Sequence, residues 1–436
     1  MEEDTKSIKD MLVDMNKCLQ CDVSQVAKGK IKLNLPKFSV NSLLNLIMTV
    51  KEILQKEPTI IELQSPVSVV GDLHGHFLDL VRILQGFGLP IARQYLFLGD
   101  FVDRGEFSIE TVIYVYLLKV NFPEKVFLIR GNHEFEYICS SSGFLNEITE
   151  FYGDRQLFYA FIDSFSVFPM AAVIDDTMLA VHGGIGPNLN ELSQIKNMQR
   201  PITEFGDDVL DSLLWSDPST EISGFETSKR GSGYLFGYDS LKKFLDSNGL
   251  TKLIRGHECV HDGVFEMFNG MLVTVFSASN YCGSVGNKAA VYTIKDKKNF
   301  DVKRFQPLPY FKRTSALYPG SMSARLDPDE DEELLELRRK RRQNLETSSL
   351  NNIPHRPPRP PPKPVPQANI KKVEGSSANR KTRSELAQLS QRAHQQQQQQ
   401  QKAVAAHVKR AANDSKLMIQ KRQPRRMIIS PVRPHK

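Results

Sequence analysis

The chain has 436 residues, 40% of them hydrophobic, and a formal net charge of +7. This length exceeds one average domain and allows a sizeable core. No run of 18 apolar residues occurs, so we predict no membrane span. The acidic start lacks the basic-then-apolar pattern of a secretory signal. Five cysteines do not make a disulfide framework in a chain this long, which favours a reducing compartment, the cytosol or the nucleus.

The charge is unevenly distributed along the chain. Residues 1–320 carry 32 Lys and Arg against 39 Asp and Glu, a net charge of −7. Residues 321–436 carry 25 Lys and Arg against 11 Asp and Glu, a net charge of +14. We therefore predict a mildly acidic globular body followed by a strongly basic tail.

The first three quarters of the chain predict helices followed by a layered domain. Residues 1–40 have the pattern of a helical lead-in, and apolar side chains at helical spacing in residues 41–64 predict an amphipathic helix and its exit. From residue 66 onward, short apolar runs alternate with helical segments, which is typical of an α/β domain. We therefore divide the chain into a lead-in (1–40), a folded domain (41–315) and a tail (316–436).

The composition of the tail differs sharply from that of the domain. An acidic stretch (327–336), a basic run (338–342), a proline-rich segment (354–366) and a glutamine run (395–401) follow one another. Such sequences cannot bury enough apolar surface to offset the entropy of ordering the chain. We therefore predict that the tail is disordered, with short helical stretches.

Two features of the tail predict partners. The P-x-x-P spacing within residues 354–366 is compatible with an SH3-type groove, and equally with a linker. The basic run 338–342 is compatible with nuclear import, an acidic protein partner or nucleic acid. No aromatic side chain follows Tyr318, so nucleic acid would bind only through its phosphates.

Five apolar runs in the domain each lead into a polar, glycine-containing cluster. The runs are residues 67–70, 95–98, 126–129, 178–181 and 253–254, and the clusters begin at Gly71, Gly99, Arg130, His182 and Arg255. The four longer runs have the length and bulk of strands, whereas the fifth, residues 253–254, is shorter and a weaker indication. Each cluster is therefore predicted to follow a strand's C-terminal end, where open α/β sheets bind ligands. The neighbouring glycines allow tight turns and a close approach of the backbone. We therefore expect the clusters to meet in one crevice.

The side chains that would meet are carboxylates, imidazoles and an amide, without a thiolate. They are Asp72, His74, Asp100, Asn132, His182 and His257. Nitrogen and oxygen donors favour Mn, Fe or Zn over a soft metal. Six ligands exceed what one catalytic ion needs, so we predict two divalent ions about 3.5–4 Å apart that share Asp100.

A two-metal centre of this kind is suited to cleaving phosphate esters. The ions lower the pKa of a bridging water, and the resulting hydroxide attacks the phosphorus directly. The leaving alkoxide needs a proton, for which we predict His133 as general acid with Asp103 as its partner. The alternative is that His133 is a further metal ligand. Arg104 offers a planar guanidinium to the phosphate oxygens.

These motifs resemble those of the phosphoprotein phosphatases, the serine/threonine phosphatase family that includes type 1, type 2A and calcineurin-like enzymes. The matching segments, within residues 40–310, are GDLHG (71–75), GDFVDRG (99–105), GNHE (131–134), HGG (182–184), RG (230–231) and FSASNYCG (276–283). The resemblance implies a metallophosphoesterase-like layered α/β sandwich, with a central mixed β-sheet flanked by helices. It also implies hydrolysis of phosphoserine and phosphothreonine in proteins.

The resemblance implies a role for individual residues as well. The ligands it implies are, for one ion, Asp72, His74 and Asp100, and for the other, Asp100, Asn132, His182 and His257. The ions would be Mn, or a pair of Fe and Zn. Arg104, Arg230 and Asn132 would bind the phosphate, and Tyr281 would face the substrate from a mobile loop. The implied partners are phosphoprotein substrates and regulatory subunits.

The sequence departs from the family pattern at several positions. His76 stands where Gln is usual, Ser279 where type 1 and type 2A enzymes have Pro, and residues 135–138 differ from the common sequence. None of these positions is a predicted metal ligand. The departures therefore affect the assignment to a subfamily, the substrate preference and the toxin sensitivity, but not the reaction. We interpret His76 as a solvated loop residue or a substrate contact.

Three alternatives compete with parts of this interpretation. The same site could serve a nuclease or a small phosphodiester hydrolase, although Arg104 and Arg230 suit a dianionic monoester better. The chain could also be a non-catalytic scaffold, but the complete ligand set argues against it. Finally, Cys18 and Cys21 have the spacing of a zinc site, but no second pair of ligands follows.

Overall fold

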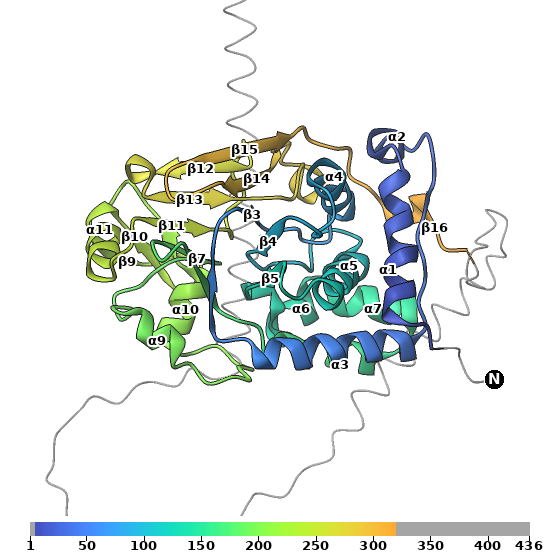
Figure 1. The fold of residues 1–436 in the computed structure, drawn as a ribbon, viewed down its shortest axis with the longest axis horizontal. Helices are drawn as coiled ribbons and strands as arrows, with labels where there is room; N and C mark the ends of the chain where they lie inside the picture. Colours follow the sequence, from blue (N-terminus) through green and yellow to red (C-terminus); the bar gives the residue numbers. More distant parts are fainter. Residues whose placement is uncertain (1–4, 320–436) are drawn as a thin grey trace, which may run out of the picture. The chain divides into compact units, whose positions relative to one another are not determined.

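The computed structural model describes residues 5–319, and Figure 1 shows their arrangement. The basic run (338–342), the proline-rich segment (354–366) and the glutamine run (395–401) lie outside the described residues, and so do the predictions made for them. Within residues 5–319, no helix is both long enough and apolar enough to cross a membrane.

Two mixed sheets form the centre of the domain. The six-stranded sheet contains, in spatial order, β12 (Val264–Met267), β13 (Leu272–Val275), β11 (Lys252–Arg255), β7 (Met178–Val181), β6 (Ala171–Ile174) and β2 (Ile60–Leu63). The five-stranded sheet contains β15 (Phe300–Phe305), β14 (Ala289–Ile294), β3 (Val67–Val70), β4 (Gln94–Phe97) and β5 (Val126–Leu128). Strands β3, β4 and β5 are mutually parallel, as are β7, β11 and β13.

The two sheets pack face to face. One continuous hydrophobic cluster joins Val69 and Leu96 of the five-stranded sheet to Ala180 and Ile254 of the six-stranded sheet. All four residues of β3 and all four of β7 are buried, which explains why these strands are apolar on both faces, apart from the small buried side chain of Ser68. The predicted layered α/β sandwich with mixed sheet pairing is confirmed, and its strands are divided between two sheets.

Helices cover both outer faces of the sandwich (Figure 1). Helices α9 (Leu192–Lys196), α10 (Asp208–Trp215) and α11 (Tyr238–Ser247) pack their apolar side chains against the outer face of the six-stranded sheet. Helices α4 (Phe77–Phe87) and α5 (Ser108–Asn121) lie beside the five-stranded sheet, and α8 (Arg155–Phe165) packs with α5 against α3 (Val40–Lys56). A small third sheet has three strands. Its central strand is β10 (Tyr234–Phe236), which lies between β8 (Asp217–Pro218) and β9 (Phe225–Thr227).

Helix α3 follows from its sequence. Ser39 precedes the helix, and its side-chain oxygen accepts a hydrogen bond from the Ser42 amide, which satisfies one donor of the first turn. Buried leucines recur along one face, and the helix ends at Lys56, two residues before Pro58. The segment that we predicted as the exit of this helix contains strand β2, and the sequence analysis did not distinguish this strand from the helix exit.

The N-terminal and C-terminal ends of the described chain meet. Helices α1 (Ile8–Asn16) and α2 (Val23–Ala27) lie where the sequence predicts a helical lead-in. Strand β1 (Leu33–Asn34) then pairs in parallel with β16 (Ala316–Leu317). The two residues of β16, which we predicted to be disordered, are therefore ordered by pairing with the lead-in.

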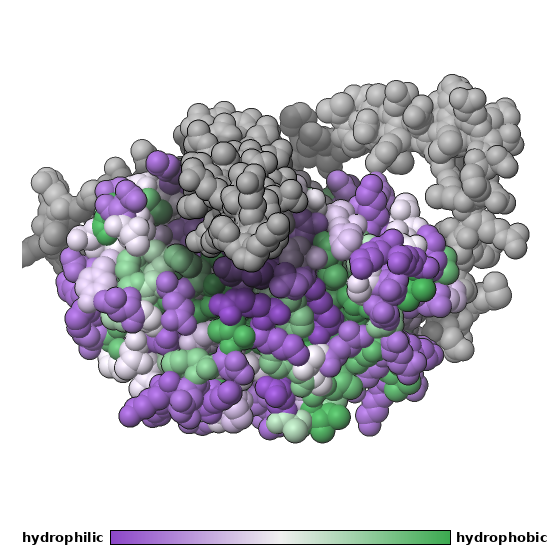
Figure 2. Space-filling model, turned by 90° about the horizontal axis from the view of Figure 1, so that it is seen from above, coloured by the Kyte–Doolittle hydropathy of each residue, from purple (hydrophilic) through white to green (hydrophobic). Residues whose placement is uncertain are grey.

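The surface of the described residues mixes hydrophilic and hydrophobic side chains, as the visible face in Figure 2 shows. Large hydrophobic side chains with an exposed fraction above one third are scattered along the chain, for example Val13, Met48, Ile91 and Phe265. Isolated apolar side chains of this kind are normal on globular proteins.

Candidate active site

The predicted polar clusters lie at neighbouring strand ends. The five predicted runs coincide, within one residue at each end, with strands β3, β4, β5, β7 and β11. Because β3, β4 and β5 are parallel in one sheet and β7 and β11 are parallel in the other, two sets of carboxyl ends meet at one edge of the sandwich. A parallel bridge between Asp72 and Phe276 joins the sheets at this edge.

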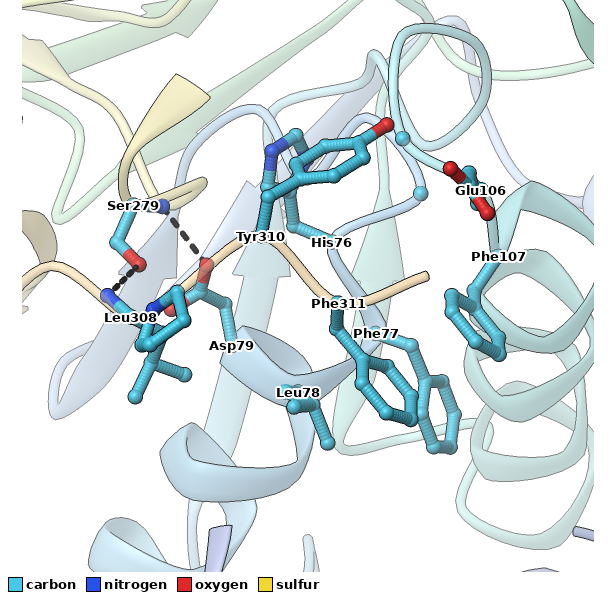
Figure 3. Close-up of a pocket in the computed structure, with 13 residues that line it drawn as sticks. His76, Phe77, Leu78, Asp79, Glu106, Phe107, Ser279, Leu308, Tyr310 and Phe311 are labelled. Atoms are coloured by element: carbon cyan, nitrogen blue, oxygen red, sulfur yellow. Dashed lines mark hydrogen bonds between the residues drawn. The ribbon is translucent and has the colours of Figure 1, made fainter. Parts of the chain in front are cut away.

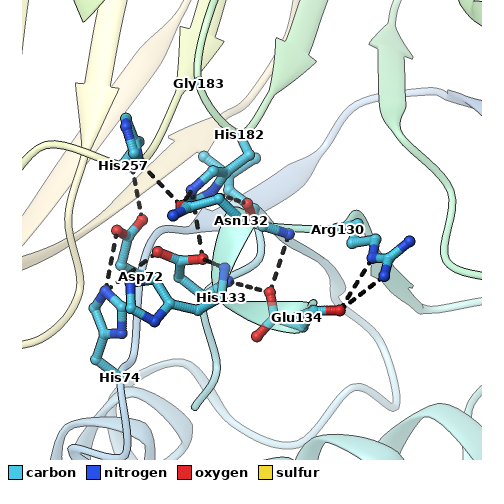
Figure 4. A network of polar contacts seen from close by, with 12 residues as sticks. Asp72, His74, Arg130, Asn132, His133, Glu134, His182, Gly183 and His257 are labelled. Carbon is cyan, nitrogen blue, oxygen red and sulfur yellow. Dashed lines mark hydrogen bonds and ion pairs between the residues drawn. The ribbon is translucent and has the colours of Figure 1, made fainter. Parts of the chain in front are cut away.

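Asp100 contacts several of the converging side chains, and Figure 4 labels Asp72, His74, His133 and His182 among them. Asp100 Oδ2 lies 3.2 Å from the Nε2 of His74, and its Oδ1 lies 3.4 Å from the Nε2 of His182. The Oδ2 of Asp72 lies 3.7 Å from the same nitrogen of His74. The four side chains joined by these distances are at most 3% exposed, so their charges are screened very little by solvent.

Asn132 brings the remaining predicted ligand into the same group. Its Oδ1 lies 2.9 Å from His182 Nε2 and 3.1 Å from His257 Nδ1. The backbone amide of His257 donates to Asp72 Oδ1 at 2.9 Å, which ties the last ligand to the first. The structure thus brings together all six side chains that the sequence singled out.

The donor atoms fit a pair of divalent cations. Two groups of side chains, one with His74, Asp100 and His133 and the other with Asp100, His182 and His257, place their donor atoms within 4.8 Å of one another. Both groups contain Asp100, as expected for a shared carboxylate. In addition, Asp72 Oδ2 and His257 Nε2 are buried without a hydrogen-bond partner, although burying an unpaired polar atom is costly.

The charges in the site also favour cations. Burial, reinforced by the charge of Asp100, raises the pKa of Asp72. The pKa of Asp100 lies well below its ordinary value, because His182, His133 and His74 outweigh the effect of burial. Burial and the charge of Arg230 hold the pKa of His257 well below its ordinary value, so its ring is neutral and keeps a lone pair for a ligand bond.

Surrounding groups orient the predicted ligands. The Nδ1 atoms of His74 and His182 face the carbonyl oxygens of Val102 and Leu98, each at 2.8 Å, which directs both Nε2 atoms into the site. The carboxylate of Glu134 accepts hydrogen bonds from the amides of Asp100, Phe101 and Gly131 at 2.8 to 3.0 Å. Our sequence analysis gave Glu134 no role, although it completes the GNHE motif.

The backbone of the site adopts conformations that most residues avoid. His74, Asp100, Asp103, Arg104 and His257 all have positive φ angles, between 43° and 72°. Such conformations cost free energy for residues other than glycine and persist where surrounding contacts enforce them, often at functional sites. The strain supports a functional reading of these five positions.

His133 and Asp103 form the predicted pair. His133 Nδ1 lies 2.6 Å from Asp103 Oδ2, and the other carboxylate oxygen accepts the amide of Phe144 at 2.9 Å. Burial lowers the pKa of His133, against the opposing charges of Asp100 and Asp103. Because Nδ1 is bonded to Asp103, Nε2 is the nitrogen left to face a substrate or an ion.

The remaining predicted residues surround this centre. Arg104 follows Asp103 on the same loop, and the ring of Tyr281 lies 5.3 Å from that of His74. Arg230 donates to Asp217 Oδ2 at 2.5 Å, and Asp217 Oδ1 lies 3.9 Å from His257 Nε2. The sequence analysis missed Asp217, since no strand-end pattern marks its link to Arg230.

His76 and the pair Cys18 and Cys21 lie outside the predicted ligand set. His76 is partly buried, which is less exposure than the predicted solvated loop residue would have: its ring packs near Tyr281 and Tyr310, and its Nδ1 lies 2.9 Å from the carbonyl oxygen of His74. Among residues 5–319, no group of metal-ligating side chains includes Cys18 or Cys21, so the zinc interpretation has no support there.

Comparisons with known proteins agree with this geometry. Residues 65–261 match the family model of calcineurin-like phosphoesterases. The chain is 42% identical over 300 residues to the serine/threonine-protein phosphatase PP2A-like PPG1 of Candida albicans, which covers 69% of this chain and 70% of that protein. A solved structure of a protein serine/threonine phosphatase from Saccharomyces cerevisiae, with similarity to human phosphatase PP5, has a TM-score of 0.59 and 34% identity, covering 62% of this chain and 91% of that one.

The layered fold and the family model define a metal-dependent phosphoesterase. At this identity and coverage, the chain belongs to the phosphoprotein phosphatase family of serine/threonine phosphatases. The resemblance seen in the motifs is therefore confirmed for the family and for the fold.

Proposed function

We propose that this protein hydrolyses phosphoserine and phosphothreonine monoesters in other proteins, by direct attack of water at a binuclear metal centre. The observation that carries the proposal is the pair of donor groups that share Asp100, one of which also includes His133, whose Nδ1 is bonded to Asp103. Family membership supports the same reaction class.

Six side chains would hold the ions. One ion would take Asp72, His74 and Asp100, and the other Asp100, Asn132, His182 and His257. When bound, such ions lower the pKa of a coordinated water and neutralise charge on the phosphoryl oxygens. Imidazole and carboxylate donors are compatible with Mn or with an Fe and Zn pair.

The other site residues would bind the phosphate and move the proton. His133 would deliver a proton from Nε2 to the leaving serine or threonine oxygen, while Asp103 fixes the ring through Nδ1. Since burial lowers the pKa of His133, the carboxylate of Asp103 is needed to favour the protonated ring. Arg104, Arg230 and Asn132 would orient the phosphate dianion, and Tyr281 would bound the site beside His74.

Partners and boundaries follow as further parts of the proposal. The substrates are phosphoproteins, and regulatory subunits, together with residence in the cytosol or nucleus, fit the family and the composition. Residues 41–315 would form the catalytic domain. For the tail, we keep an SH3-type partner at residues 354–366 and an acidic or nucleic-acid partner at the basic run as proposals from sequence.

The replacement His133→Asn tests the role of the proton donor. Turnover of a phosphopeptide should fall by about 10²- to 10⁴-fold, the usual effect of losing an acid catalyst. Metal content measured on the same sample should remain that of the wild type, because Asn132 and the other ligands are untouched. A loss of metal would instead show that His133 is a ligand.

The substrate class is tested by comparing three compounds on the wild-type protein. A phosphopeptide and a nitrophenyl monoester should be hydrolysed, and a bis-nitrophenyl diester much more slowly, because Arg104 and Arg230 suit a dianion. Preference for the diester would contradict the proposed substrate class. Absence of turnover with metals bound would contradict catalysis altogether.

A further inference from the structure

The segment that follows the last strand of the five-stranded sheet has no part in the function proposed above. We call residues 306–317 the strap. It leaves β15 and ends in β16, which pairs with β1 of the N-terminal lead-in, and Figure 1 shows it in orange. Between these two anchors it lies against the loops that carry Asp103, Arg104 and Tyr281.

The strap is hydrogen-bonded to both of these loops, and Figure 3 shows its bond to Ser279. The Leu308 amide donates to Ser279 Oγ at 3.2 Å, and the Leu308 carbonyl oxygen accepts from Asn280 Nδ2 at 3.0 Å, just before Tyr281. The hydroxyl of Tyr310 donates to the carbonyl oxygen of Arg104 at 3.0 Å. Leu308 and Tyr310 therefore connect the two loops from outside the site.

Tyr310 occupies a close-packed position between them. A Cβ atom built on Gly283 would lie 2.9 Å from the Cβ of Tyr310, so the two chain segments touch directly. The Tyr310 ring also lies 6.0 Å from the ring of His76, edge to face. These contacts and the hydrogen bond to the Arg104 carbonyl oxygen together hold the side chain of Tyr310 in place.

A second strap residue fixes the start of helix α5. Arg313 donates to both carboxylate oxygens of Glu110, at 2.7 and 2.6 Å, and to Glu147 at 2.5 Å. Glu147 in turn accepts the amides of Ser108 and Ile109 at 3.0 and 2.9 Å. Arg313 therefore anchors the strap to the helix that follows the Asp103–Arg104 loop.

The loop itself needs such support. Asp103 and Arg104 have φ angles of 72° and 70°, a conformation that side-chain-bearing residues hold only when their surroundings enforce it. The Gly105 amide donates to the Asp103 carbonyl oxygen at 2.8 Å, and the Asp103 amide donates to Ser108 Oγ at 3.1 Å. The hydrogen bond from the Tyr310 hydroxyl restrains the next carbonyl group, that of Arg104, and Arg104 is the residue that would bind phosphate.

We propose that Tyr310 is a positioning residue for phosphate binding. Its hydroxyl holds the Arg104 peptide so that the guanidinium is oriented before substrate arrives. The inference rests on the proposed function, in which Arg104 binds the phosphate. It predicts an effect on phosphate affinity, whereas a strap that only completes the fold would affect stability alone.

The replacement Tyr310→Phe removes the hydroxyl and keeps the ring. The KM for a nitrophenyl monoester and the inhibition constant of inorganic phosphate should both rise about 3- to 10-fold, the effect of one lost hydrogen bond. The melting temperature and metal content should stay near wild type. Tyr95→Phe is the matched control, because its hydroxyl donates to a backbone carbonyl, that of Gly88, away from the site.

Combining Tyr310→Phe with Arg104→Ala separates the two levels of the proposal. If Tyr310 acts through Arg104, Tyr310→Phe should change neither constant further once Arg104 is Ala. If Arg104→Ala raises the phosphate inhibition constant but Tyr310→Phe does not, the positioning inference is overturned and the proposed function stands. If Arg104→Ala has no effect on phosphate inhibition, the proposed role of Arg104 fails, and the inference fails with it.

Discussion

At the scale of single residues, the six predicted ligands could be found from sequence because each follows a strand. Their residue types then point to the chemistry. Glu134 and Asp217 act differently, through hydrogen bonds to the backbone of Asp100 and to the side chain of Arg230. Such links are formed by tertiary contacts and leave no periodic pattern, which is why the sequence did not reveal them.

The replacement of Gly256 allows a prediction at the scale of a single residue. A Cβ atom at Gly256 would lie 2.5 Å from Asp72 Oδ1, closer than real Cβ contacts allow. Gly256→Ala should therefore displace the carboxylate, and we expect lower metal content and at least a tenfold loss of phosphopeptide turnover, about 1.4 kcal/mol or more. Elemental analysis and kinetics on one preparation measure both quantities.

The control for this replacement is Gly224→Ala. An added Cβ at Gly224 meets no atom within 4 Å, and its φ angle is not in the left-handed region. It should leave metal content and turnover at wild-type values. Equal behaviour of the two variants would show that the Gly256 contact with Asp72 is not needed for the site.

At the scale of elements, the strands that could be predicted are those that are buried along their whole length. β3 and β7 were predicted with the bounds found, because each is a short, fully buried run, apolar except for Ser68, that ends in a glycine-containing polar cluster. β2 follows α3 closely, and the sequence did not separate it from the helix exit. β16 depends on pairing with β1, a partner far away in the chain, and no local pattern indicates it.

Helix α3 allows a stability prediction with an internal control. Leu46 is fully buried on the face that packs toward α5 and α8, whereas Met48, two residues along, is 62% exposed. Leu46→Ala should lower the free energy of unfolding by about 2–5 kcal/mol, because it removes buried methyl groups and leaves a cavity. Met48→Ala should change it by no more than about 0.5 kcal/mol.

Urea denaturation followed by circular dichroism measures both changes. Both variants should keep their KM values, since α3 contributes no residue to the site. Similar losses of stability in the two variants would contradict the structure, in which Leu46 lies on the buried face of α3 and Met48 on the exposed face.

At the scale of the whole molecule, the sequence predicted layers but not how the strands divide between sheets. The six-stranded sheet places β2 beside β6 and β7 beside β11, so strands that are far apart in the sequence become neighbours. Strand pairing of this kind is decided by long-range contacts. The site is likewise built from both sheets. The ends of β3, β4 and β5 in the five-stranded sheet position Asp72, Asp100 and Asn132. The ends of β7 and β11 in the six-stranded sheet position His182 and His257.

This division predicts that metal binding stabilises the entire domain. Asp72 and Asp100 are both buried, and the charge of Asp100 contributes to the raised pKa of Asp72. Bound ions would compensate these charges and connect both sheets. Stability should therefore increase with free metal, by about 4 kcal/mol at a concentration 1,000 times the dissociation constant.

The measurement is the melting temperature of chelator-treated protein as Mn is added. We expect a rise that saturates with the same midpoint as recovery of phosphopeptide turnover, since one centre is responsible for both. Asp100→Asn should largely abolish the rise, because the replaced carboxylate is common to both donor groups. An undiminished rise in that variant would place the stabilising ions elsewhere and separate the stability of the fold from the proposed binuclear centre.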